Sequence, residues 1–202
     1  MRVRFVLTVV AMIVASVAAQ ADTISTFTTN NGVVAGGFFG QAFTVSGTGS
    51  FTDIAFSFLK NGEAVPASGT GYIFASEYSG TPAGLGSSDY LASGTASGDA
   101  YDFGSSVTLV AGQTYYFYEF YESGGLPGLV FNGDEAPGIG PFLASPLAGG
   151  SDIPFTTHLN QSADYLVTGS AAAASVTPEP SGFLLLGTGL LGVAGVIKKR
   201  LA

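Results

Sequence analysis

The chain has 202 residues, among them 30 glycines, 16 phenylalanines and 9 tyrosines, with no cysteine and no tryptophan, and its formal net charge is −8. The lack of cysteine excludes disulfide bonds, a cysteine nucleophile and a thiolate metal site, so stability has to come from the burial of apolar and aromatic side chains. This length suffices for one domain with a substantial core once the two terminal segments described below are set aside.

Residues 1–21 have the three parts of a secretory signal peptide. Two arginines near the start supply positive charge, and an apolar stretch at 5–17 follows them. Ala19 and Ala21 place small residues at the two positions that signal peptidase requires, so we expect cleavage before Asp22. A retained N-terminal membrane helix is the less favoured alternative, because the apolar stretch is short for a span of ~20 residues.

Residues 22–169 are predicted to form an all-β domain. Aromatic and β-branched residues alternate with small polar ones, turn residues separate the segments, and helical periodicity is nearly absent. The clearest alternation is that of Ile54, Phe56 and Phe58, which Asn61-Gly62 follows as a turn that needs positive φ. The expected strands are 41–45, 51–60, 71–78, 90–93, 101–103, 107–110, 114–121, 129–131 and 163–168.

Many short strands with turns between them predict a β-sandwich or jelly roll. The segment Val-Thr-Leu-Val-Ala-Gly-Gln-Thr-Tyr-Tyr-Phe at 107–117 resembles the penultimate hairpin of extracellular jelly-roll modules, among them carbohydrate-binding and choice-of-anchor domains. An immunoglobulin-like sandwich is less favoured, because the chain has neither a tryptophan nor a cysteine pair. Residues 123–154 are rich in glycine and proline and are expected to form a long loop, and residues 170–177 a linker.

The expected strand at 114–121 carries aromatic residues on both faces. Tyr116 and Tyr118 share one face, and Tyr115 and Phe117 share the other. Packing in the core is the favoured interpretation, with one face directed inward and the other partly covered or exposed. The alternative is an exposed row in which Tyr116 and Tyr118 stack on sugar rings, since an aromatic ring with a polar tip suits carbohydrates.

Two loops offer oxygen ligands for a cation. Asp99 and Asp102 form one candidate set, and Asp134 and Glu135 form the other. Calcium is the metal that such carboxylates prefer, and it is the one cofactor that the sequence suggests. Neither set completes a calcium-loop pattern, so ordinary solvated turns are the favoured interpretation.

The sequence contains no convincing catalytic motif. His158 is the single histidine, and no nucleophile motif accompanies it. Glu119 and Glu122, a candidate pair for a glycoside hydrolase, are expected on opposite faces of one strand. We therefore expect a protein that is not an enzyme, with a secreted glycoside hydrolase as the least favoured alternative.

Residues 178–202 have three parts. They are Pro178-Glu179-Pro180, an uncharged apolar run at 181–197, and the basic cluster Lys198-Lys199-Arg200. A helix over the apolar run spans about 25 Å, near the lower limit for a single transmembrane helix. The basic cluster favours a cytoplasmic C-terminus. An ordinary tail anchor is one interpretation of this segment.

The same three features resemble the PEP-CTERM sorting signal. In that family, a membrane protease of the exosortase type recognises the signal, and the substrate is released or passed to the cell surface or an extracellular polysaccharide matrix. The resemblance implies that Pro178, Glu179 and Pro180 are recognition residues and that the helix at 181–197 anchors a precursor in the membrane.

The charge of the middle segment limits its partners. From Asp22 to Glu179 the chain has 14 acidic residues, one lysine (Lys60) and no arginine, which argues against nucleic acid and anionic membrane surfaces as partners. The combined expectation is an exported protein, located at the cell surface or outside the cell, with a structural or adhesive role in a polysaccharide or biofilm matrix. A carbohydrate-binding module is the alternative.

Overall fold

The computed structural model describes residues 21–28, 33–35, 37–120, 129–132, 142–146, 152–159 and 161–172. They belong to a unit that ends at Ala172. The expected signal helix, most of the expected loop at 123–154 and the expected transmembrane helix at 181–197 lie outside the described residues. Within the described part of the chain, no helix has both the length and the apolar character that a membrane span needs.

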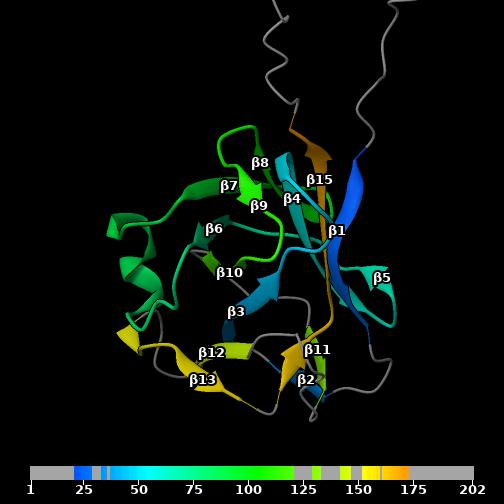
Figure 1. The fold of residues 1–202 in the computed structure, drawn as a ribbon. Coiled ribbons are helices and arrows are strands. Elements are labelled where there is room, and N and C mark those ends of the chain that lie inside the picture. Colours follow the sequence, from blue (N-terminus) through cyan, green and yellow to red (C-terminus); the bar gives the residue numbers. More distant parts are fainter. Residues whose placement is uncertain are drawn as a thin grey trace, which may run out of the picture. The chain divides into compact units, whose positions relative to one another are not determined.

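Strands dominate the described residues, which confirms the predicted all-β class (Figure 1). The elements are β1 (Asp22–Phe27), β2 (Val33–Ala35), β3 (Gly37–Thr44), β4 (Ser50–Lys60), β5 (Glu63–Ala64), β6 (Thr70–Phe74), the 3-10 helix η1 (Pro82–Ser87), β7 (Ala92–Ser97), β8 (Ala100–Gly104), β9 (Leu109–Val110), β10 (Thr114–Phe120), β11 (Leu129–Asn132), β12 (Phe142–Pro146), β13 (Thr156–His158), β14 (Ser162–Ala163) and β15 (Tyr165–Ala171). Each segment predicted to be a strand overlaps an observed strand, whereas β1, β2, β5, β12 and β13 were not predicted.

Most strands belong to one antiparallel sheet. Its order is β1-β15-β4-β8-β7-β6-β10-β3-β12-β13, with β5 and β9 also paired to β4. A separate three-stranded sheet has the order β14-β11-β2. Because β1 and β3 are far apart in the order of the large sheet, a contact between them requires the sheet to curl.

The large sheet curls until it is nearly closed into a barrel (Figure 1). At the point of closure, the amide and the hydroxyl of Ser46, just beyond β3, both donate hydrogen bonds of 2.7 Å to the carbonyl oxygen of Ile24 in β1. Curling places the inward faces of non-adjacent strands against each other, and this creates the core.

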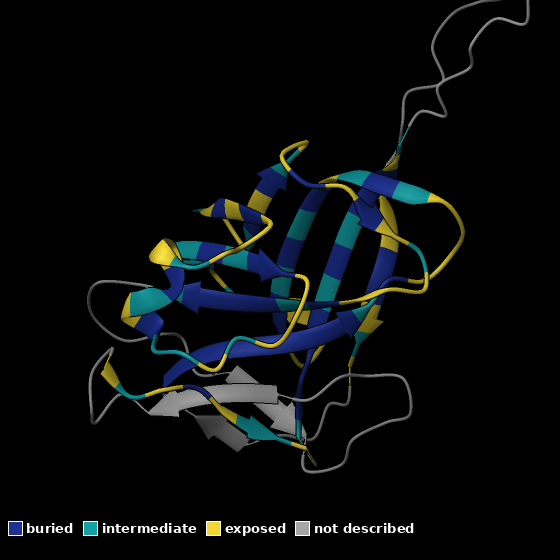
Figure 2. Ribbon diagram, turned by 60° about the vertical axis from the view of Figure 1, so that its left-hand side comes forward, coloured by how far each residue is buried: buried dark blue, intermediate teal, exposed yellow. Residues whose placement is uncertain are grey.

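The alternation predicted for β4 is observed, with one local correction. Phe51 and Ile54 are both buried although they are three residues apart, and the residues between them are half-buried or exposed (Figure 2). Asp53 takes a φ of 51°, and the register against β8 shifts directly after Ile54. This β-bulge resets the alternation, so that both apolar residues face the core.

The core is built mainly from aromatic rings. Phe56 of β4 and Phe117 of β10 stack at 3.8 Å between ring centroids with an interplanar angle of 4°. Tyr101 of β8 and Phe58 of β4 pack around Phe117 at 5.1 and 5.4 Å. Full burial of such a side chain contributes ~1.5–3 kcal/mol, so these rings are the main apolar contribution to stability.

A second cluster lies on the opposite face of β10 and β3. It consists of Phe38, Phe74, Leu85, Tyr118 and Phe155. Leu85 comes from η1, which begins at a proline suited to the first helical turn. Gly40 of β3 permits this packing, because a Cβ there would lie 2.7 Å from the Tyr118 ring.

Two expectations about the fold differ from the structure. Separate stacked sheets were expected, but hydrogen bonding is continuous through the hairpin of β7 and β8, where Ala96 is paired with Tyr101. The expected linker was to begin at residue 170, but Ser170 and Ala171 pair with Thr52 and Phe51 of β4. The strand therefore continues to Ala171, since backbone pairing with β4 remains available to small residues.

Candidate functional site

The aromatic strand β10 has two different environments on its two faces. Tyr115 and Phe117 belong to the inner core cluster, and Glu119, on the same face, is buried beside them. Tyr118 belongs to the outer cluster, and Tyr116 packs against that cluster. The division of the residues between faces was predicted correctly from the alternation. One face packs inward, and the other is partly covered, with Tyr118 buried and Tyr116 and Phe120 half-buried.

Tyr118 is wrong as a candidate glycan contact. Its side chain is 0% exposed, and its hydroxyl lies 2.8 Å from the amide of Tyr78 and donates to the carbonyl oxygen of the same residue at 3.2 Å. Burial raises the pKa of Tyr118 well above its ordinary value. A side chain enclosed in this way cannot stack on a ligand, so Tyr116, which is half-buried, is the remaining member of the expected pair.

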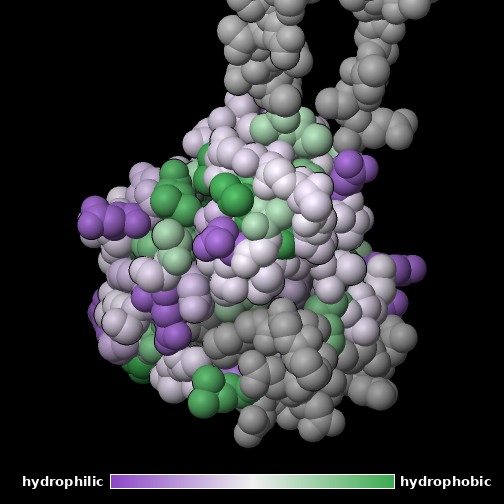
Figure 3. All heavy atoms as spheres, viewed as in Figure 1, coloured by the Kyte–Doolittle hydropathy of each residue, from purple (hydrophilic) through white to green (hydrophobic). Residues whose placement is uncertain are grey.

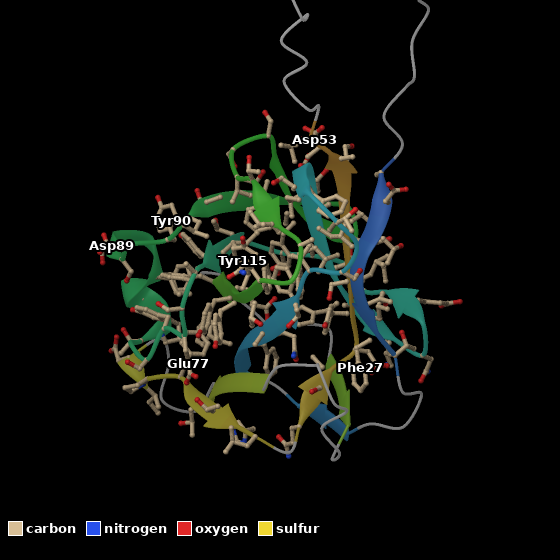
Figure 4. The ribbon with its side chains drawn as sticks, viewed as in Figure 1. Phe27, Asp53, Glu77, Asp89, Tyr90 and Tyr115 are labelled. Atoms are coloured by element: carbon tan, nitrogen blue, oxygen red, sulfur yellow. The ribbon has the colours of Figure 1, made fainter. Side chains whose placement is uncertain are left out.

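A different aromatic pair is accessible on the outside of the fold. Tyr90 is 37% exposed and meets the ring of Tyr72 edge to face, with 5.2 Å between ring centroids. Leu91 beside it is 44% exposed, and its amide donates to the carbonyl oxygen of Ile73 at 2.7 Å. Figure 4 shows Asp89 and Tyr90 together at the outer edge of the fold, whereas Tyr115 lies toward its middle.

The accessible pair was missed because of a boundary error. A strand was expected to begin at Tyr90, but β7 begins at Ala92, and Tyr90 lies in the connection from η1. Burial raises the pKa of Tyr72, and the nearby Tyr90 hydroxyl raises it further. Together the two rings give an amphipathic aromatic surface, which can stack on the apolar face of a sugar.

Exposed apolar residues do not form one large surface on the side shown in Figure 3. Polar residues divide them there into small separate groups. Val110 on β9 and Leu159 after β13 are further exposed examples. Small groups of this kind are normal for a folded domain, so the aromatic pair is distinguished by its chemistry and not by its area.

The structure places one of the two candidate calcium sets. Asp99 lies in the turn between β7 and β8, and Asp102 lies in β8, where its Oδ1 accepts a hydrogen bond of 2.8 Å from the amide of Gly104. In the part of the chain that the structure describes, no group of three or more His, Cys, Asp or Glu residues could hold a metal ion. Asp134 and Glu135 lie outside that part, so calcium binding stays a prediction.

The remaining candidate residues fall in three places. His158 is at the end of β13, where it is paired with Phe142 of β12. Glu119 is 1% exposed and faces the core instead of a cleft, while Glu122 lies outside the described residues. Of the two signal-cleavage residues, Ala21 is exposed and directly precedes β1, so cleavage there leaves the strand intact.

Comparison with known families decides the nature of the C-terminal segment. Residues 176–200 match the family described as the PEP-CTERM protein-sorting motif. The chain carries a PEP-CTERM sorting motif. A search of curated proteins and a search of solved structures found no match. The matched range contains Pro178, Glu179 and Pro180 and the basic residues Lys198, Lys199 and Arg200, all of which lie outside the described residues.

The sorting motif implies the cellular route of this protein. It implies an exported protein with a precursor that is anchored in the membrane and processed by an exosortase. The motif begins a few residues after β15, the last strand of the folded unit. Export therefore delivers a β domain that is connected to its sorting motif by a short segment.

Proposed function

We propose that the mature domain is a non-enzymatic component of the cell surface or of an extracellular polysaccharide or biofilm matrix, with a structural or adhesive role. The sorting motif at 176–200 carries this proposal, because it defines the destination. The acidic composition agrees with it, since one lysine against 14 acidic residues from Asp22 to Glu179 keeps an extracellular protein soluble and disfavours the binding of nucleic acid.

The strand order supports an extracellular jelly-roll module. The eight strands from β1 to β3 in the large sheet divide into two halves, β1-β15-β4-β8 and β7-β6-β10-β3. If these eight strands are renumbered 1 to 8 in chain order (β1, β3, β4, β6, β7, β8, β10, β15), the two halves have the orders 1-8-3-6 and 5-4-7-2. An eight-stranded arrangement of two four-stranded sheets is that of a jelly roll, and here the β7–β8 hairpin joins the halves.

The processing of the chain gives the first test of this proposal. We expect the protein recovered from the matrix to begin at Asp22 and to end near Pro178–Ser181, because signal peptidase cuts after Ala21 and exosortase acts near the Pro-Glu-Pro sequence. Intact mass spectrometry of the membrane and matrix fractions measures both ends. A variant in which Pro178, Glu179 and Pro180 are all replaced by Ala is expected to stay in the membrane fraction.

Two outcomes would contradict the proposed role. One is a final product in the membrane that still carries Lys198-Lys199-Arg200, which would identify 181–197 as a permanent anchor. The other is a correctly trimmed protein that is entirely free in the medium and absent from washed matrix. Export would stand in that case, but a structural or adhesive role would not.

Carbohydrate binding is the second candidate function, and the exposed Tyr90, whose ring meets that of the half-buried Tyr72, favours it. Aromatic stacking contributes ~0.5–1.5 kcal/mol beyond burial of area, so Tyr90→Ala should weaken retention on the polysaccharide about twofold to tenfold. Affinity electrophoresis in gels containing the purified polysaccharide measures this retention. Val110→Ala, at an exposed residue on β9, is the matched control, and equal retention of all three proteins would reject a sugar contact at Tyr90.

A further inference from the structure

A carboxyl group is enclosed in the aromatic core. Glu119 projects from the inward face of β10 and is 1% exposed. Its Oε2 lies 2.7 Å from the hydroxyl of Tyr101, and its Oε1 has no hydrogen-bond partner among the described residues. Burial raises the pKa of Glu119 to about 8, although the hydrogen bonds from Tyr101 and from the backbone of Phe39 act in the opposite direction.

Hydrogen-bond geometry around Tyr101 indicates which group holds the proton. The Tyr101 hydroxyl has a single hydrogen, but two acceptors lie near it: the Ser68 carbonyl oxygen at 2.9 Å and Glu119 Oε2 at 2.7 Å. Both contacts are hydrogen bonds when Glu119 is protonated, because its own hydrogen then goes to Tyr101 and the tyrosine hydrogen goes to Ser68. The partnerless Oε1 is then a neutral carbonyl oxygen, which costs far less in the core than a charged one.

Tyr101 connects this buried proton to a surface segment. Ser68 belongs to residues 65–69, which join β5 to β6, and its amide also points to the Tyr101 hydroxyl at 3.4 Å. The rest of the segment is held by backbone bonds from Val65 to Phe58, from Ala67 to Gly98 and from Ala96 to Gly69, and by the packing of Val65 and Ala67 against the core. The contact with Tyr101 is therefore the one that fixes Ser68 between these anchored residues.

We propose that Glu119 is a proton-controlled latch that fixes the 65–69 segment through Tyr101. With Glu119 protonated, the Tyr101 hydrogen is directed at Ser68 and the segment is held. When Glu119 loses its proton, the carboxylate takes the Tyr101 hydrogen and the Ser68 carbonyl loses its donor. Ser68 then keeps only the 3.4 Å contact of its amide with the Tyr101 hydroxyl, and the segment is loosened. The latch does not depend on the proposed matrix role.

The groups around Glu119 agree with control by one proton. The neighbouring strands bring Phe39 and Gln41 from β3 and Ile73 from β6, and none of these ionises. β8 brings Tyr101, the titratable group in hydrogen-bond contact. Other titratable side chains buried in this unit are Tyr115, Tyr118, Asp164 and Tyr165. None of them contributes to the raised pKa of Glu119, which comes from burial.

The sign of the pH effect follows from the raised pKa. The protonated form is favoured in the folded state, so its contribution to stability is complete below the ordinary value of 4.5 and is lost as the pH rises through about 8. Within that window, the unfolding equilibrium constant should increase about tenfold for each pH unit through this one group. Protection of the amides of Val65 and Ala67 against hydrogen exchange should fall as the pH rises through about 8, where Glu119 loses its proton in the folded state.

The test compares the exported protein isolated from cells with Glu119→Gln, whose amide donates to Tyr101 at every pH. Denaturant unfolding and hydrogen-exchange protection factors are measured from pH 5 to 8.5. We expect a steep pH dependence in the natural protein, a flatter one in E119Q, and no change of slope in the control Glu63→Gln, which alters an exposed glutamate of β5. Tyr101→Phe should lower protection in 65–69 equally at all pH values.

An independent readout keeps the proposal testable if E119Q does not fold. In the natural protein, the infrared band of a buried, protonated carboxylic acid should be present at pH 5 and nearly absent about two pH units above the pKa of about 8. Absence of this band at pH 5 would overturn the proposal. So would identical slopes for E119Q and the natural protein, or protection in 65–69 that does not change with pH while Glu119 ionises.

Discussion

A chain that ends after Asp164, and so lacks β15, is expected to have no cooperative unfolding transition, whereas a chain that ends after Ala172 is expected to fold. β15 lies between β1 and β4 and pairs with both of them, so its removal leaves β1 without its ladder partner. It also removes Tyr165 and Val167 from the core, where both are fully enclosed. Circular dichroism during thermal unfolding measures the transition.

The two chain ends make this a matched comparison. The longer chain keeps the last observed backbone bond, in which the Ala172 amide donates to Ser50 at 2.8 Å, and it lacks only the sorting segment. A cooperative transition in the shorter chain would show that β1 finds another partner. If instead the longer chain failed to fold, residues beyond Ala172 would be required for the fold.

The position of β15 also limits the order of events during export. The strand that completes the sheet is the last one before the sorting motif, so the domain cannot finish folding until residues up to Ala171 have crossed the membrane. An exosortase cut near the Pro-Glu-Pro sequence falls beyond this strand. A cut at that place would leave every paired residue of β15 in the domain.

Local structure was predictable where the pattern was strong. Asn61-Gly62 predicted a turn with positive φ, and the two residues have φ values of 54° and 81°. The alternation of Ile54, Phe56 and Phe58 predicted the buried face of β4. By contrast, β1 was missed because its outer residues are short and polar, and it becomes a strand through pairing with β15.

Features that depend on distant residues could not be predicted. Tyr118 is buried because η1 and Phe155 cover it and because Gly40 leaves room for its ring. The contact of Glu119 with Tyr101 forms between β10 and β8, which are not neighbours in the sheet order. The alternation of side chains along a strand places Glu119 on the same face as Phe117. That this face is enclosed follows only from the curling of the sheet, which the sequence does not reveal.

Phe117→Ala is expected to lower the free energy of unfolding by ~3–5 kcal/mol, the usual range for loss of a phenylalanine from a core. Phe117 is 0% exposed and packs against Phe56, Phe58 and Tyr101, which come from two other strands. The backbone around the resulting cavity cannot collapse easily, because its walls belong to a paired sheet. Urea unfolding followed by circular dichroism measures the change.

Phe120→Ala provides the matched control for that substitution. Phe120 is on the same strand but on the outer face, where it is half-buried and stacks on Phe38 at 5.9 Å. Its loss should cost only about 1 kcal/mol, because part of the ring is already in water. Equal losses for the two variants would mean that the stack of Phe56 and Phe117 is not the centre of the core. Since a natural domain is stable by only ~5–15 kcal/mol, the expected difference decides whether the variant remains folded.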